Sequence, residues 1–125
     1  MAETYDQAAL RHLKDAESLA EQARFDSAGH LVGFAAECAI KFAIASLRPG
    51  AEAPHVHFPY LIEAAKKHVH GRRQTSISII LHTPSFMSGW DVNHRYWENG
   101  NISKDQYERW RRDASKAVGA AGLRR

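Results

Sequence analysis

The sequence predicts an all-α fold, a four- to five-helix up-and-down bundle. Residues 25–47 form the longest apolar run, with apolar or small residues on nearly every side of a helical projection, which is typical of a helix buried among others. Residues 5–23 and 103–121 each carry one apolar stripe at helical spacing, as amphipathic helices do. The length of 125 residues suits one domain, covering 1–125, with a hydrophobic core of its own.

The first predicted helix spans residues 5–23. Thr4 and Gln7 have the T-x-x-Q spacing of a capping box at its start. Its inner stripe consists of Leu10, Leu13, Ala16, Ala20 and Ala23. Only residues 24–26 separate this helix from the next, and so short a connection predicts an antiparallel hairpin. For the central helix, Asp26 or Ser27 is the expected N-cap, and Pro49-Gly50 is the stop signal.

Glu37 and Lys41 are the only charged residues within 27–47. One interpretation is a polar stripe that reaches solvent, worth about 0.2–0.5 kcal/mol as an i, i+4 pair. The other is that Glu37 faces a groove or dimer seam and binds a cation from another helix, with Arg95 as the expected partner, because a buried charge needs one. The two charges leave far less than the ~20 apolar residues that a bilayer requires, so no membrane span is expected.

The second half of the chain is predicted to hold two or three further helices. Residues 48–59 contain three prolines and form a loop, and a helix follows over 60–69. The apolar run 77–81 fits either a strand or a helix; a helix is expected, since a single strand in a helical domain has no partner. Thr83-Pro84 then opens a short turn that Gly89 ends. Ser103 and Gln106 form a capping box for the final helix.

The charge of the chain is unevenly distributed. The net charge is +3, but residues 1–60 carry five basic and eight acidic residues, whereas residues 61–125 carry twelve and six. This asymmetry indicates either a basic surface for an anion, a nucleic acid or an acidic partner, or a solvated basic helix face.

Several classes of protein are disfavoured by the motifs that are missing. Cys38 is the only cysteine, so an internal disulfide is impossible, and the first ten residues lack the features of a signal peptide; we expect a cytoplasmic protein. The pairs His55-x-His57 and His68-x-His70 have no Cys or carboxylate at ligand spacing. No metal and no cofactor are therefore expected, and no phosphate-binding loop or hydrolase motif occurs.

Residues 90–99, WDVNHRYWEN, combine aromatic, basic and amide side chains before the final helix. Aromatic rings stack on bases and arginine binds phosphate through a planar fork, so this segment is a candidate ligand site. The alternative is a packed turn, in which Trp90 and Tyr96 close the end of the bundle and Arg95 pairs with a carboxylate.

Two segments resemble proteins of the HEPN-domain family: RHLKDAESLAEQARFDSAGHLVGFAAECAIKFAI at 11–44 and GWDVNHRYWENGNISKDQYERWRRDA at 89–114. The resemblance implies a HEPN-like helical bundle, usually a homodimer with a cleft between the subunits. Members of the family include RNases of toxin–antitoxin and defence systems, binders of nucleotides or RNA, and partners of small nucleotidyltransferases.

Nuclease members of that family have an Arg followed four to six residues later by His, R-N-x-x-x-H. Arg95 matches the arginine, but no histidine follows at that spacing, and His94 precedes it. The sequence therefore predicts a non-catalytic module for a nucleotide, RNA or a nucleotidyltransferase partner. The expected ligand-binding residues are Glu37, Lys41, Arg95, Tyr96, Trp97, Arg109 and Arg112. One alternative is a metal-independent RNase with Arg95 on the phosphate and His94 as base; another is a purely structural subunit.

Overall fold

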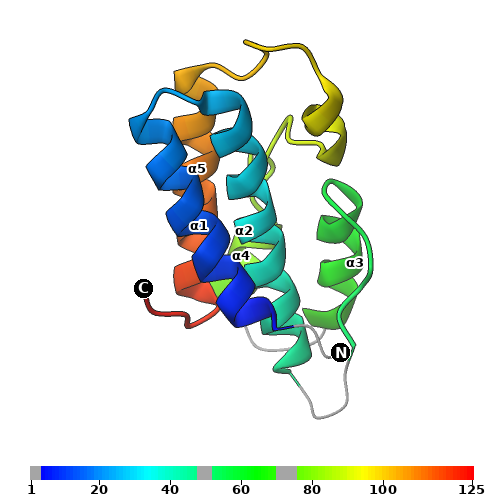
Figure 1. Cartoon of the computed structure of the whole chain (residues 1–125). Coiled ribbons are helices and arrows are strands. Elements are labelled where there is room, and N and C mark those ends of the chain that lie inside the picture. The colour runs from blue at the N-terminus through cyan, green and yellow to red at the C-terminus, as the bar shows by residue number, and fades with distance from the viewer. Residues whose placement is uncertain (1–3, 48–51, 70–75) are drawn as a thin grey trace.

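Five α-helices and one 3-10 helix occur in the computed structural model, which describes residues 4–47, 52–69 and 76–125. They are α1 (Tyr5–Glu21), α2 (Phe25–Ala45), α3 (Tyr60–Val69), α4 (Ser76–Leu81), the 3-10 helix η1 (Val92–Tyr96) and α5 (Lys104–Ala120). The predicted all-α bundle is confirmed (Figure 1), as is the helix preferred over a strand at 77–81. The expected stop at Pro49-Gly50 and the histidine at 70 lie outside the described residues.

The predicted hairpin of the first two helices is confirmed, and Thr4 is the N-cap of α1 as expected, but its capping box does not form and the N-cap predicted for α2, Asp26 or Ser27, is wrong. Neither Thr4 at α1 nor Arg24, the actual N-cap of α2, makes a side-chain capping bond. Ala23 adopts a left-handed conformation (φ 60°), and the Arg24 N–H donates to the Leu19 carbonyl at 3.0 Å. This pattern ends α1 as a Schellman motif does and turns the chain directly into α2.

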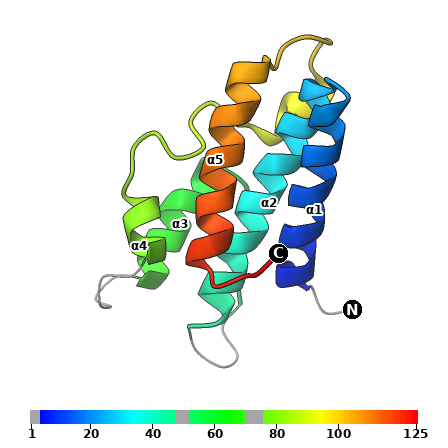
Figure 2. The ribbon, with the colours of Figure 1, turned by 90° about the vertical axis from the view of Figure 1, so that its left-hand side faces the viewer.

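Asp26, expected to cap α2, instead binds a loop that is distant in sequence. Its carboxylate accepts the N–H groups of Gly100 at 2.7 Å and Ile102 at 3.0 Å. The predicted cap of α5 is confirmed, because the Ser103 hydroxyl accepts the Gln106 N–H at 3.0 Å. These bonds fix the start of α5 beside the start of α2, and the two helices then run in the same direction, antiparallel to α1 (Figures 1 and 2).

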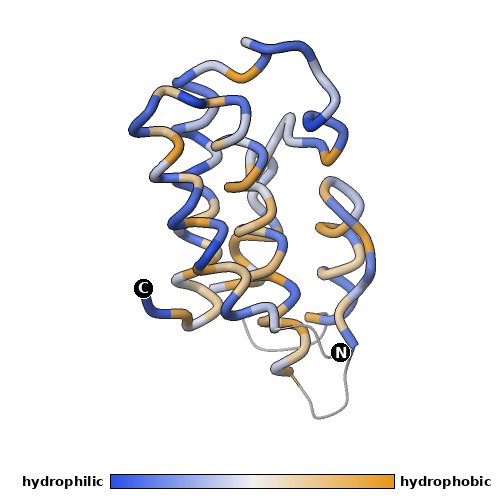
Figure 3. The backbone as a smooth tube through the Cα atoms, in the orientation of Figure 1, coloured by the Kyte–Doolittle hydropathy of each residue, from blue (hydrophilic) through white to orange (hydrophobic). Residues whose placement is uncertain are grey.

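Helix α2 is the centre of the bundle and packs against α1, α3, α5 and η1. Its buried residues lie on several sides: Ala28, Gly29, Val32, Gly33, Ala35, Ala36, Glu37, Ala39, Ile40 and Ile44. Hydrophobic positions dominate its C-terminal half, whereas hydrophilic and hydrophobic positions alternate along α1 (Figure 3). By length and composition alone α2 would suffice to cross a membrane, and 56% of its most apolar window is buried inside the bundle; buried core helices share this property.

The homodimer expected from the sequence stays a prediction. Most of the apolar surface of α2 is covered within the chain, and what is left for a second copy is a half-exposed stripe formed by Leu31, Phe34, Cys38 and Phe42.

Trp90 lies directly against α2 at two glycines. A Cβ atom added to Gly33 would lie only 1.9 Å from the Trp90 ring, and the Trp90 Nε1–H donates to the Gly29 carbonyl at 2.9 Å. Trp90 is 2% exposed. The absence of a side chain at Gly33 is therefore what lets the indole reach the α2 backbone.

We expect Gly33→Ala to destabilise the fold by roughly 1–3 kcal/mol or more, because overpacking must displace the Trp90 ring. Gly119→Ala is the matched control: Gly119 lies in α5 with nothing within 4 Å of an added Cβ, so this change should stabilise by about 0.4–1 kcal/mol. Urea unfolding of both variants measures the difference. Equal stability of the two variants would contradict the close contact between Trp90 and α2.

Candidate functional site

The turn that precedes η1 is held by three hydrogen bonds, two to α5 and one to α2. The Met87 N–H donates to Asp113 of α5 at 2.9 Å, and the Trp110 indole N–H donates to the Ser88 carbonyl at 2.9 Å. Trp90 adds its bond to α2. Asp91 then caps η1, since its Oδ1 accepts the Asn93 N–H at 2.7 Å. The start of η1 is thus attached to both α2 and α5 by bonds from buried or half-buried groups.

The aromatic and basic residues in and around η1, from Trp90 to Trp97, divide into a buried set and an exposed set. Trp90 packs as the packed-turn interpretation expects, but Tyr96 is 75% exposed and Trp97 is 50% exposed. The Arg95 guanidinium lies 4.9 Å from the Tyr96 ring centroid, and no ion pair joins Arg95 to a carboxylate of the described residues. Arg95, Tyr96 and Trp97 therefore form a continuous exposed surface.

His94 lies in the core among the three tryptophans of the chain. Its ring centroid is 3.9 Å from Trp97, 5.5 Å from Trp110 and 6.2 Å from Trp90. It is 7% exposed, and burial lowers the pKa of its imidazole, while the charge of Asp91 opposes this shift. The predicted alternative in which His94 acts as a base would need this buried ring to become accessible, because a base must reach the proton that it removes.

Glu37 is buried, at 2% exposure, so the solvent-stripe interpretation is wrong; of the other interpretation the burial is confirmed, whereas the groove or dimer seam stays a prediction. Its expected partner is also wrong. Oε1 lies 2.8 Å from His57 Nδ1, and Oε2 accepts the Phe58 N–H at 2.7 Å; Arg95 is not involved. Burial raises the pKa of the Glu37 carboxyl, and its two hydrogen bonds oppose the rise.

Lys41 does not share a ligand groove with Arg95. Its Nζ lies 5.9 Å from the ring centroid of Tyr5 in α1. Arg109 and Arg112 are also placed elsewhere: Arg109 donates to Gln106 at 2.9 Å, and Arg112 lines a groove of about 910 Å³ between α1 and α5. Of the seven predicted ligand residues, the structure brings together Arg95, Tyr96 and Trp97.

Two histidines missed by the sequence reasoning join this surface. The rings of His30 and His57 pack on Phe34, at 4.7 and 6.0 Å between centroids. Burial lowers the pKa of His30, and so do the charges of Arg95, His94 and His57. The side chain of His57 is 46% exposed. We call His30, His57 and Arg95 the basic cluster.

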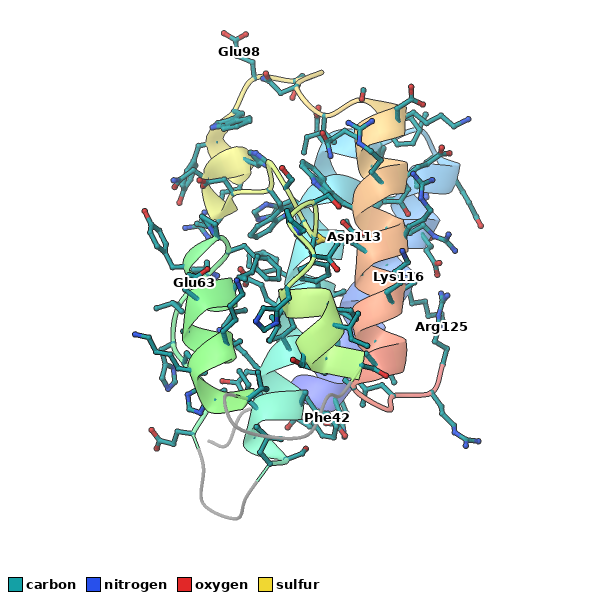
Figure 4. All side chains as sticks on the ribbon, turned by 180° about the vertical axis from the view of Figure 1, so that it is seen from behind. Phe42, Glu63, Glu98, Asp113, Lys116 and Arg125 are labelled. Atoms are coloured by element: carbon teal, nitrogen blue, oxygen red, sulfur yellow. The ribbon has the colours of Figure 1, made fainter. Side chains whose placement is uncertain are left out.

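A second groove, of about 440 Å³, is lined by residues that flank α3 and η1. Trp97 directly follows η1, and Pro59 directly precedes α3. The residues that line it are Pro59, Ile62, Pro84, Phe86, Met87, Ser88, Gly89, Trp90, Asp91 and Trp97. We call it the Trp97 groove. In Figure 4, Glu98 extends away beyond η1, whereas Lys116 and Arg125 lie along the α5 side of the molecule.

No group of three or more His, Cys, Asp or Glu side chains among residues 4–47, 52–69 and 76–125 is arranged to hold a metal ion. Comparisons with protein-family models, curated proteins and solved structures return no match. The resemblance to HEPN-domain proteins therefore stays a prediction, and the function has to be argued from the site itself.

The Glu37 carboxyl makes stability depend on pH. Because its pKa is raised above an ordinary value of 4.5 in the folded chain, its favourable contribution is present below that value and is lost as the pH rises through the raised pKa. Glu37→Gln cannot titrate. The free energy of unfolding of the wild type, relative to this variant, should thus fall between pH 4.5 and neutrality. Urea unfolding at several pH values measures it, and an increase with pH would contradict a buried carboxylate.

Proposed function

We propose that this chain is a binding module for a nucleotide or single-stranded RNA, and that η1 makes the central contact. The observation that carries the proposal is the exposure of three consecutive residues, Arg95, Tyr96 and Trp97, at the end of a 3-10 helix that is fixed to the core. Exposed aromatic rings next to a cation are how proteins bind single strands, since every base has a face that stacks and every nucleotide has a phosphate.

The surroundings of Arg95 favour an anion. The charge of Arg95 opposes the protonation of His30, and so does the charge of His57. A phosphate placed among these groups would replace repulsion by attraction. Residues 61–125 also have an excess of basic over acidic residues, which adds long-range attraction for a polyanion.

The neutral part of the site suits a base. Adjoining large apolar side chains that are exposed often mark a binding surface. Tyr96 and Trp97 are neighbours, and they are 75% and 50% exposed. The Arg95–Tyr96 contact holds the guanidinium and the ring in one arrangement. Because both side chains are already placed, little conformational entropy is lost when a ligand binds.

We expect purified protein to bind labelled single-stranded RNA, with an affinity that falls steeply with salt, by about 0.7 log units per phosphate contact for each log unit of salt. Tyr96→Ala should weaken binding by about 1–3 kcal/mol through lost stacking, and Arg95→Gln should reduce the salt dependence. Fluorescence anisotropy measures both.

Arg109→Gln is the matched control for Arg95→Gln. It removes the same charge from an exposed arginine whose guanidinium donates a hydrogen bond to Gln106 in α5 rather than contacting η1. Equal losses in the two variants would contradict a site at η1. An absence of RNA and nucleotide binding at low salt would leave the third interpretation, a structural partner of another protein such as a nucleotidyltransferase.

A second candidate function, metal-independent RNA cleavage, is favoured by the contact between Glu37 and His57. An ionised carboxylate only accepts, so Nδ1 of His57 donates to Glu37 and Nε2 is free to accept a proton. His57 is half-exposed and belongs to the basic cluster. His57 would take the proton of a 2′-hydroxyl, and the 2′-oxygen would bond to phosphorus while the bond from phosphorus to the 5′-oxygen breaks. The 5′-oxygen would then take a proton from water, and His57 would return its own proton to solvent. This assignment gives His57 the base role that the sequence placed on His94.

The two functions are separated by incubating the protein with labelled RNA in the presence of EDTA. Cleavage that persists in EDTA and is lost in His57→Ala, with RNA binding retained, would establish the second function. His55→Ala, in the same loop but exposed, is the control. Intact RNA under conditions where binding is saturated would leave the non-catalytic module, which we expect.

A further inference from the structure

The Trp97 groove is suited to one flat, heteroaromatic group. Its volume of about 440 Å³ lies in the usual range for small-ligand sites. Trp97 supplies an exposed ring at its edge, and Pro59 and Ile62 supply apolar surface opposite. Its back wall, the turn around Met87, is tied to Asp113 of α5, so the groove keeps its width without a ligand.

Asp91 is the one carboxylate that lines this groove. Its Oδ1 is used by the Asn93 N–H at the cap of η1. Its Oδ2 has no hydrogen-bond partner among the described residues. Oδ2 is not among the buried unpaired side-chain atoms of the described residues, so it is open to solvent and is available to accept a hydrogen bond from a ligand in the groove.

We propose that the Trp97 groove binds a guanine base, which stacks on Trp97 and donates hydrogen bonds to Asp91. The Watson–Crick edge of guanine carries two adjacent donors, N1–H and one N2–H. They match the two oxygens of a carboxylate, since Oδ1 of Asp91 keeps a second lone pair besides the one that the Asn93 N–H uses. Adenine and cytosine place a ring-nitrogen acceptor beside their amino group, and uracil places carbonyl oxygens on both sides of its N3–H. Those acceptors would face the negative charge of Asp91, so the carboxylate selects guanine.

This inference rests on the proposed function and adds base specificity to it. Two sets of residues suit the two parts of a nucleotide. Arg95 and His57 belong to the basic cluster, whereas Trp97 and Pro59 line the groove. A guanine nucleotide within a single strand can therefore place its base in the groove and an adjoining phosphate at Arg95.

The test compares RNA strands of about eight nucleotides, close to the site sizes of single-strand binders. Each strand is oligouridine with one central G, A, C or U. We expect the G strand to bind the wild type roughly 10-fold more tightly than the other three, as one bidentate contact permits. Asp91→Asn should abolish this preference: asparagine can still cap η1, but it offers a donor where the carboxylate offered an acceptor.

Glu98→Gln is the matched control, since it removes a negative charge from an exposed loop residue that does not line the groove, and it should keep the preference for G. Circular dichroism checks that each variant is folded. Equal binding of all four strands by the wild type would overturn the guanine assignment and leave the proposed function standing. Failure of every strand to bind at low salt would overturn both. A preference for G that survives Asp91→Asn would assign the specificity to another group.

Discussion

The contact of Trp90 with the α2 glycines is the constraint on which the site depends. The indole occupies the space that a Cβ at Gly33 would need and donates to the Gly29 carbonyl. Trp90 thereby fixes the end of the segment between α4 and η1, which has little regular structure of its own. Because Trp90 directly precedes the cap of η1, its position determines where the exposed side chains of η1 are presented.

A second contact with α2 fixes the opposite side of the site. Glu37 holds His57 and the Phe58 N–H, and these residues lead into α3. A buried carboxylate is unfavourable unless its hydrogen bonds are made, so the loop must stay in place for the core to remain satisfied. The site residues thus lie on irregular segments, while α2 supplies the rigid part to which both segments bind.

The sequence predicted well what depends on local pattern. Helical periodicity gave α1, α2, α3 and α5, and the Ser103 cap follows from a bond to Gln106 three residues away. The errors concern partners that are far apart in the chain. Asp26 caps nothing in α2 because its carboxylate is used by Gly100 and Ile102, and the partner of Glu37 is 20 residues away rather than on another helix. No periodicity encodes such pairs, so the basic cluster could not be predicted.

The buried polar atoms that lack partners support the location of the site. Within the described residues, the side-chain atoms of this kind are His30 Nδ1, both ring nitrogens of His94 and the Tyr107 hydroxyl. Most buried polar groups in proteins are paired, and an unpaired one costs about 1–3 kcal/mol. Three of these four atoms belong to His94, which directly precedes Arg95, and to His30, whose ring stacks on Trp90. A sequence selected for stability alone would place apolar side chains there, so these unpaired histidines are one of the observations on which the proposed site at η1 rests.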